Sequence, residues 1–426
     1  MPISPINSTS QKGLAHGLNA QAISYFLNFL LLIINPLIVI CLKSFVRNYR
    51  VRLGEQVLIA TSVALFFCNR DFGVDLGGGA IDDVPQYVYL FNQATTHHFT
   101  YLLQGWSFEP GFIALTKILA LFLSSPKMYL FFIFFILNFC IIRASTIINK
   151  KNPLLAYFFF IGFFGLNTYI VMHVLRQALG FGFIILAMAE SSTRTNSIYE
   201  KPWTLAILLV GCSMHISAVM FALAYLVAKI FWTKSRLILF LGLFSVTLAP
   251  ILAQAAFSAF TALSPRIEGY EAAKTIALIG SSGLAAAVGM STILIFTAIR
   301  FPSRSEFSSL WYVGGVLGLA ITGVALFSII PVQAVFRQLA FTLALLSMIF
   351  AGLLESDTRQ MMVIRYFILA VCCIRFLVII GEPAPHLLPF QKSGALNPLS
   401  GILTNGYDLW TSPKSVPAYM GWGDLQ

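Results

Sequence analysis

Charged residues are scarce in this chain. Only 10% of its 426 residues are Asp, Glu, Lys or Arg, whereas soluble globular proteins carry about 25%. Acidic residues are the scarcer kind, with 16 against 27 basic ones. Because so few charges cannot coat a soluble domain of this length, the deficit excludes that class of protein.

Motifs for cofactors, metals and nucleotides are also missing. The six cysteines lie in or at the ends of apolar segments, and no spacing among them indicates a metal site or a disulfide framework. No Walker loop, dinucleotide glycine fingerprint or zinc-protease motif occurs. We therefore expect no metal, no cofactor and no use of ATP by this chain.

Apolar residues are what the chain has in excess, at 58% hydrophobic and 14% aromatic. One soluble core cannot hide that much apolar surface, so lipid has to solvate it, in spans of about 20 residues. The candidate spans are Ala22–Leu42, Gln56–Cys68, Met128–Ile148, Leu154–His173, Ala178–Glu190, Leu237–Phe260, Ile276–Ile299, Ser308–Pro331, Val332–Leu354 and Met361–Ile380.

The predicted fold is therefore all-α, a polytopic transmembrane helical bundle with about 10–12 spans and one integral membrane domain over residues 1–426. Two apolar segments do not have the length of a simple transmembrane span. Gly111–Ser124 is too short and carries Lys117, and Trp203–Ile230 is too long for one span and too short for two. Irregular backbone at membrane depth is tolerated only where it is buried in protein or lines a cavity. We expect one or both segments to be re-entrant or broken helices beside a cavity.

The net charge of +11 does not indicate nucleic acid, because most basic residues lie in short clusters between apolar runs. Such clusters are typical of cytoplasmic loops in membrane proteins. One topology places all of them inside and the amino terminus outside. It puts residues 69–110 on the outer face as a loop that contains an amphipathic helix near Gln86–Leu103, and it puts the tail 381–426 there too.

Acidic residues gather in that outer loop. They are Asp71, Asp75, Asp82, Asp83 and Glu109, with Arg70 and Tyr87 close in sequence. A carboxylate that faces a dry cavity can act as a general base or bind a cation. A solvated outer loop would have a similar composition, so the sequence leaves both readings open.

Arginine marks two further turns, as Arg176–Gln177 and as Arg337–Gln338. The forked guanidinium suits capture of phosphate, so two such residues could clamp a diphosphate. Snorkelling to lipid headgroups is the alternative for Arg176. Arg143 lies within a span, where we expect it to pair with an acid or a carbonyl.

His215 lies in the middle of the segment Trp203–Ile230, between Ser213 and Ser217. A histidine at such a position is either a satisfied core residue or part of a functional cavity. No acidic residue follows at a spacing that would indicate a triad, and both readings stay open.

These residues form an ordered set that resembles the EpsG/Wzy group of bacterial polysaccharide polymerases. The family pattern is an acidic motif with Tyr, then E-x-G-F, Arg-Gln-Ala and His-x-Ser-Ala. Here the set reads Arg70–Asp71, Ile81-Asp82-Asp83-Val84-Pro85-Gln86-Tyr87, Phe108-Glu109-Pro110-Gly111-Phe112, Leu175-Arg176-Gln177-Ala178-Leu179 and Met214-His215-Ile216-Ser217-Ala218. The insert Gly77–Gly79 leaves open whether Asp75 or the pair Asp82 and Asp83 supplies the matching acid.

The resemblance implies a glycosyltransferase that joins oligosaccharide units carried on undecaprenyl diphosphate into O-antigen, capsular or exopolysaccharide. The reaction would be an inverting-type transfer at the outer face of the bacterial inner membrane, in a multi-pass protein with a glycosyltransferase-C-like fold by analogy. The implied partners are the lipid-linked oligosaccharide, the bilayer, a chain-length regulator and a flippase. The candidate bases, in order, are Asp83, Glu109 and His215, with Asp82 adjoining Asp83; the diphosphate ligands are Arg176, Arg337 and Arg70; and the other substrate-binding residues are Tyr87, Gln177 and Asp75.

Three other functions compete with this reading. An O-antigen ligase performs the same chemistry on another acceptor. Ligases typically carry a long outer loop late in the chain, whereas the corresponding loop here, residues 261–275, is short, which favours the polymerase. A flippase or transporter of lipid-linked sugars would spread charges along many helices and show internal repeats. The main evidence for a membrane acyltransferase would be His215, a histidine deep in the membrane.

Overall fold

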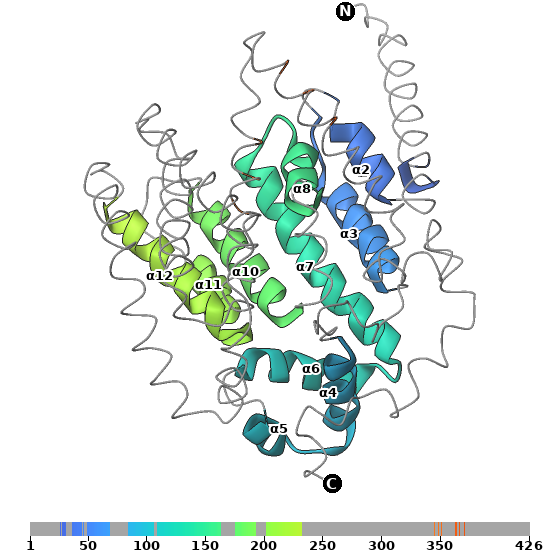
Figure 1. Cartoon of the computed structure of the whole chain (residues 1–426), viewed down its shortest axis with the longest axis vertical. Coiled ribbons are helices and arrows are strands. Elements are labelled where there is room, and N and C mark those ends of the chain that lie inside the picture. Colours follow the sequence, from blue (N-terminus) through green and yellow to red (C-terminus); the bar gives the residue numbers. More distant parts are fainter. Residues whose placement is uncertain are drawn as a thin grey trace, which may run out of the picture.

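A computed structural model of the chain describes residues 26, 28–30, 36–44, 46, 49–68, 84–105, 109–162, 175–192 and 202–231, and the isolated residues 345, 348, 351, 363, 366 and 370. Over these residues the protein is helical and has no strand, which confirms the all-α prediction there (Figure 1). The helices are α2 Pro36–Ser44, α3 Leu53–Cys68, α4 Val84–Thr96, α5 Phe99–Gly105, α6 Pro110–Phe122, α7 Pro126–Ile148, α8 Pro153–Gly162, α10 Leu175–Ser192, α11 Pro202–Met214 and α12 Ile216–Phe231.

Helix α7 is the centre of the described structure. Figure 1 shows it running diagonally through the molecule, and α3, α8 and α10 pack along it. Pro126 stands at its start, where the missing N–H breaks no helical bond. Within the described residues α7 is the one helix that is both long and apolar enough to cross a bilayer, with 23 residues and a mean hydropathy of 2.2. It matches the predicted span Met128–Ile148.

The other predicted spans are tested only in part. The apolar helices α3, α6 and α11 are shorter than a bilayer requires. All the spans predicted after Leu237 lie outside the described residues, apart from a few isolated helical positions. The total of about 10–12 spans therefore stays a prediction.

Buried polar side chains join the helices across their apolar faces. Tyr157 on α8 donates to Asn138 Oδ1 on α7 at 2.5 Å. The hydroxyls of Thr116 on α6 and Tyr129 on α7 lie 3.1 Å apart. Such bonds between helices fix which faces meet, because an unsatisfied polar group in an apolar interior is costly.

Helices α4, α5 and α6 form a layer across one end of α7 and α10 (Figure 1). The predicted amphipathic helix over Gln86–Leu103 is two helices, α4 and α5, that are separated at His97 and His98. The apolar face of α4 packs into the protein, where Phe91 stacks on Tyr129 with ring centroids 4.7 Å apart.

Lys117 explains both the end of α4 and the charge in the short helix α6. Its Nζ donates to the carbonyl oxygens of Ala94 at 2.5 Å and His97 at 2.7 Å. The last carbonyls of a helix have no partner within it, and a cation at this end also favours the helix dipole. The lysine therefore holds α4 against α6 instead of facing lipid.

The long segment Trp203–Ile230 is interrupted at a single residue. Helix α11 ends at Met214, α12 begins at Ile216, and His215 lies between them. This is the break that the sequence predicted for the segment. The other awkward segment, Gly111–Ser124, is one short continuous helix, α6.

Asn152 joins two segments that lie far apart in sequence. Its Nδ2 donates to the carbonyls of Ser44, the last residue of α2, at 3.0 Å and of Val46 at 2.7 Å. Its Oδ1 accepts from the backbone N–H of Leu155 at 3.1 Å, in the first turn of α8. The side chain thus caps α8 and fixes α2 to it.

We predict that Asn152→Ala destabilises the protein, because it leaves two carbonyls and one N–H without this partner. The expected loss is about 1–3 kcal/mol, seen as a lower melting temperature of the detergent-solubilised protein. Asn92→Ala, at an exposed position of α4, is the control and should melt like the parent. Equal melting of all three proteins would contradict the role given to Asn152.

Candidate active site

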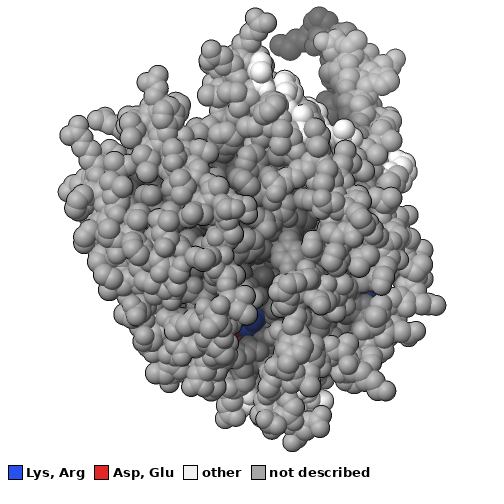
Figure 2. Space-filling model, viewed as in Figure 1, with Lys and Arg blue, Asp and Glu red and all other residues white. Residues whose placement is uncertain are grey.

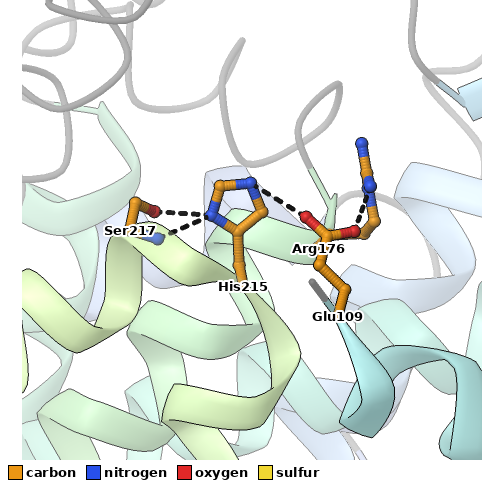
Figure 3. Close-up of polar contacts among 4 residues, drawn as sticks. All are labelled: Glu109, Arg176, His215 and Ser217. Carbon is orange, nitrogen blue, oxygen red and sulfur yellow. Dashed lines mark hydrogen bonds and ion pairs between the residues drawn. The ribbon is translucent and has the colours of Figure 1, made fainter. Parts of the chain in front are cut away.

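Three of the four sequence motifs, together with Tyr87 of the first, meet at one place among the described residues. Glu109 precedes α6, Arg176 is the second residue of α10, and His215 separates α11 from α12. Figure 3 shows their side chains pointing toward one another. Arg176 Nη1 donates to Glu109 Oε2 in an ion pair, and His215 Nε2 lies 3.2 Å from Glu109 Oε1. Oε2 of Glu109 thus accepts from Arg176, and Oε1 faces a ring nitrogen of His215.

Pro110 explains how Glu109 comes to point at these partners. It starts α6, so Glu109 falls at the residue before the helix, where a following proline disfavours helical backbone. The Glu109 side chain makes no capping bond to its own helix. Its carboxylate turns instead to α10 and to His215, and the residue is only 7% exposed.

Gly111 allows the start of α6 to lie directly against the end of α11. A Cβ placed on Gly111 would come within 2.8 Å of Ser213 Cβ and 2.9 Å of the Ser213 carbonyl carbon. Any larger residue would therefore separate the two helices. This contact places Glu109 within reach of His215, and it gives the glycine of the E-x-G-F motif a physical reason.

A second close contact packs α10, which carries Arg176, against α11 and α12 on either side of His215. A Cβ on Gly180, one turn after Arg176 in α10, would lie 3.0 Å from the carbonyl oxygen of Gly211 in α11 and 3.1 Å from Ala218 Cβ in α12. The backbones of α10 and α11 therefore touch here. The alanine of the His-x-Ser-Ala motif packs at the same contact.

Aromatic rings support the guanidinium of Arg176. Its Cζ lies 5.4 Å from the ring centroid of Tyr87 on α4, within the range of a cation–π contact. Tyr87 in turn packs edge-to-face on Phe112, at 5.5 Å between centroids. Both rings are fully buried. The guanidinium is therefore held by a carboxylate and by an aromatic face, which together fix its orientation.

The Glu109–Arg176 pair is buried, as is the pair of Lys43 with Glu55, whose side chains are 13% and 5% exposed. The side chains of Arg176 and Glu109 are 13% and 9% exposed. Arg143 on α7 also pairs with an acid, as predicted, but its contact to Glu190 is 3.5 Å and the two side chains are 40% and 28% exposed. A solvated pair contributes little, whereas breaking a buried pair strands a charge in a poor solvent. Figure 2 shows a basic and an acidic side chain next to each other on one face, in the region where α6 begins in Figure 1.

Some predicted site residues are described and others are not. Tyr87, Glu109, Arg176 and His215 come together, and Gln177 is buried on α10 next to Arg176 in sequence. The residues that lie outside the described part of the chain are Arg70, Asp71, Asp75, Asp82, Asp83 and Arg337. Among the described residues, no three His, Cys, Asp or Glu side chains gather as metal ligands would.

Ser217, which lies beside His215 in the sequence motif and has no predicted role of its own, belongs to the site. Ser217 contacts His215 twice: the hydroxyl Oγ lies 2.7 Å from Nδ1, and the backbone N–H donates to Nδ1 at 3.1 Å. The spacing of the His-x-Ser motif carries the signal, because a residue two positions into a helix presents its N–H to the residue that caps the helix.

We predict that Gly111→Ala destabilises the protein by about 1–3 kcal/mol, since the new methyl group overlaps Ser213 and α6 has to move away from α11. Gly54→Ala is a matched control, because nothing lies within 4 Å of a Cβ there. Thermal unfolding of both variants measures the difference. A Gly111→Ala protein as stable as the Gly54→Ala protein would show that α6 and α11 are not in this contact.

Comparison with known proteins gives a family match that covers this site. No curated protein and no solved structure matches the chain. The model of the EpsG family matches residues 57–391, which is more than three quarters of the chain and contains Glu109, Arg176 and His215. The chain therefore belongs to the EpsG family, a family of membrane proteins.

Proposed function

We propose that this protein is a glycosyltransferase that polymerises lipid-linked oligosaccharide repeat units at the outer face of a bacterial inner membrane. Membership of the EpsG family supports a polysaccharide-polymerase type of role. The observation that carries the proposal is the buried contact of Glu109 with Arg176 and His215. It brings a carboxylate and a fixed guanidinium together, which are the two groups that glycosyl transfer from a diphosphate needs.

The reaction moves a glycan from undecaprenyl diphosphate to a second lipid-linked unit. A hydroxyl oxygen on the terminal sugar of the acceptor attacks the anomeric carbon of the donor. The bond from that carbon to the diphosphate oxygen breaks, and the undecaprenyl diphosphate leaves with the electron pair. A carboxylate takes the hydroxyl proton, which is needed because a sugar hydroxyl is a weak nucleophile at neutral pH. Attack opposite to the leaving group inverts the anomeric centre.

Arg176 is the group best placed to stabilise the leaving diphosphate. Its guanidinium is oriented in advance by Glu109 and Tyr87, and donors fixed before the reaction need no reorganisation as charge develops. Arg70 and Arg337 are proposed as further diphosphate ligands. Gln177 and Asp75 are proposed to bind other parts of the substrate.

The base is proposed to be one of the carboxylates, with Asp83 first and Glu109 second. Asp82 adjoins Asp83 and would position it. Glu109 accepts from Arg176 on Oε2 and lies 3.2 Å from His215 Nε2 on Oε1. A carboxylate held in an ion pair pulls less strongly on a further proton, which keeps Asp83 ahead in the order.

The proposed location follows from the basic loops, which place the motifs on the outer side of the inner membrane. Lipid-linked units would reach that side through a flippase, and a chain-length regulator would act on the product. The sequence supports these partners through the family resemblance alone.

Glu109→Gln tests the function in the source bacterium. We expect a deletion strain that carries this variant to make single-repeat products and no polymer. The amide removes the negative charge, and its NH2 group would point at an N–H group of Arg176 or His215. Gel analysis of surface polysaccharide measures the chain length. Glu190→Gln, in the more exposed pair, is the control and should restore full-length polymer.

The deletion strain itself separates the competing functions. Loss of a polymerase leaves single-repeat products at the surface, loss of a ligase leaves no glycan on the final acceptor, and loss of a flippase strands the units inside the cell. Either of the last two results would contradict the proposed function.

Arg176→Lys should be nearly as damaging as Arg176→Ala. An ammonium cannot reproduce a planar fork that binds a carboxylate, lies over the ring of Tyr87 and, as proposed, binds a diphosphate. Both variants should lower the amount of polymer by roughly 10²-fold or more, with normal protein levels in the membrane. Arg143→Lys, at the half-exposed pair, should keep the parental ladder. Full-length ladders from Arg176→Lys would indicate a snorkelling side chain instead.

A further inference from the structure

The contacts of His215 determine which of its nitrogens carries a proton. The backbone N–H of Ser217 donates to Nδ1 at 3.1 Å. A backbone N–H can only donate, so Nδ1 has to offer a lone pair. An imidazolium and the tautomer protonated on Nδ1 both lack that lone pair. The ring is therefore neutral, with its proton on Nε2, an assignment that follows from the hydrogen-bond network.

Nε2 is the nitrogen that faces Glu109. It lies 3.2 Å from Oε1, so in this tautomer its N–H is on the side of the carboxylate. The Ser217 hydroxyl lies 2.7 Å from Nδ1 and shares the one lone pair of that nitrogen with the backbone N–H, because Nδ1 has no proton to give. Donation therefore runs from Ser217 to His215, and His215 turns its N–H to Glu109. Both ring nitrogens are engaged in this chain of contacts.

The local fold produces this arrangement. His215 is the residue before α12, and the first N–H groups of a helix have no partner within it. A side chain at this position commonly accepts from the second or third residue of the helix, as His215 Nδ1 does from Ser217 (Figure 3). The break between α11 and α12 thus fixes both the orientation of the ring and its tautomer.

We propose that His215 is a positioning residue and not the base. Ser217 holds it as the neutral tautomer with a proton on Nε2, and it orients Glu109, which in turn orients Arg176. During transfer the hydroxyl proton passes to a carboxylate, and the N–H bond of His215 neither forms nor breaks. This inference rests on the proposed function for its role in catalysis, while the tautomer rests on the contacts alone.

Nitrogen NMR tests the tautomer without any measurement of activity. The protein is labelled with 15N-histidine and studied in lipid nanodiscs near neutral pH. The chain has six histidines, so His215 is identified by the signals that disappear in His215→Gln. We expect a neutral ring with the proton on Nε2. A proton on Nδ1, or on both nitrogens, would overturn the proposal.

Substitution tests the role. The amide N–H of Gln can reach about as far as Nε2 of His, so His215→Gln keeps a donor to Glu109 but cannot serve as a base. We expect it to retain polymer in the complemented deletion strain, while His215→Ala loses roughly 10- to 100-fold through the lost bond to a charged group. Glu190→Gln again serves as control. If His215→Gln is as inactive as His215→Ala, with both proteins folded and inserted, an N–H donor to Glu109 does not suffice for activity. His215 would then exchange a proton during the reaction, and the positioning role would be wrong.

The two proposals fail in different ways. Long polymer from Glu109→Gln and Arg176→Lys would end the proposed mechanism and leave the NMR result standing. Loss of polymer in those variants, combined with an Nδ1-protonated ring, would leave the function standing and end the inference about His215.

Discussion

The described structure depends on the carboxylate of Glu109, which is nearly buried and accepts from Arg176 on one oxygen and faces His215 on the other. A charge in an apolar interior is stable only when its oxygens are satisfied. Its partners come from α10 and from the break between α11 and α12, so three separate segments have to converge on it. The backbone contacts of Gly111 and Gly180 make that convergence possible, because side chains at those positions would hold the helices apart.

The same constraint recurs at three other places among the described helices. Lys117 binds the carbonyls at the end of α4, Asn152 binds the carbonyls at the end of α2, and Tyr157 binds Asn138. Each polar side chain satisfies a group on another element. In a chain with so few charges, these bonds decide which helices are neighbours, since apolar faces alone pack against many partners equally well.

The sequence predicts part of this well. The apolar run Met128–Ile148 indicates α7, the length and polar centre of Trp203–Ile230 indicate the break at His215, and motif order indicates that Glu109, Arg176 and His215 belong together. It could not show that Glu109 lies against His215, because that depends on the separation of α6 from α11, which Gly111 controls through an absent side chain. Nor could it show the end of α4, where the capping group is Lys117, a residue distant in sequence. Local patterns predict helices; contacts between distant residues set their ends and their spacing.

Charge balance links the site to the substrate proposed for it. With His215 neutral, the described cluster of Glu109, Arg176 and His215 has no net charge, which suits burial among apolar helices. A diphosphate diester carries a negative charge on each phosphate and gains another as it leaves. Arg176 already compensates Glu109, so this cluster alone cannot neutralise the leaving group. The mechanism therefore requires positive charge from elsewhere in the chain, and Arg70 and Arg337 are the residues that the sequence offers for it. The buried pair would then supply orientation, and the added arginines most of the charge.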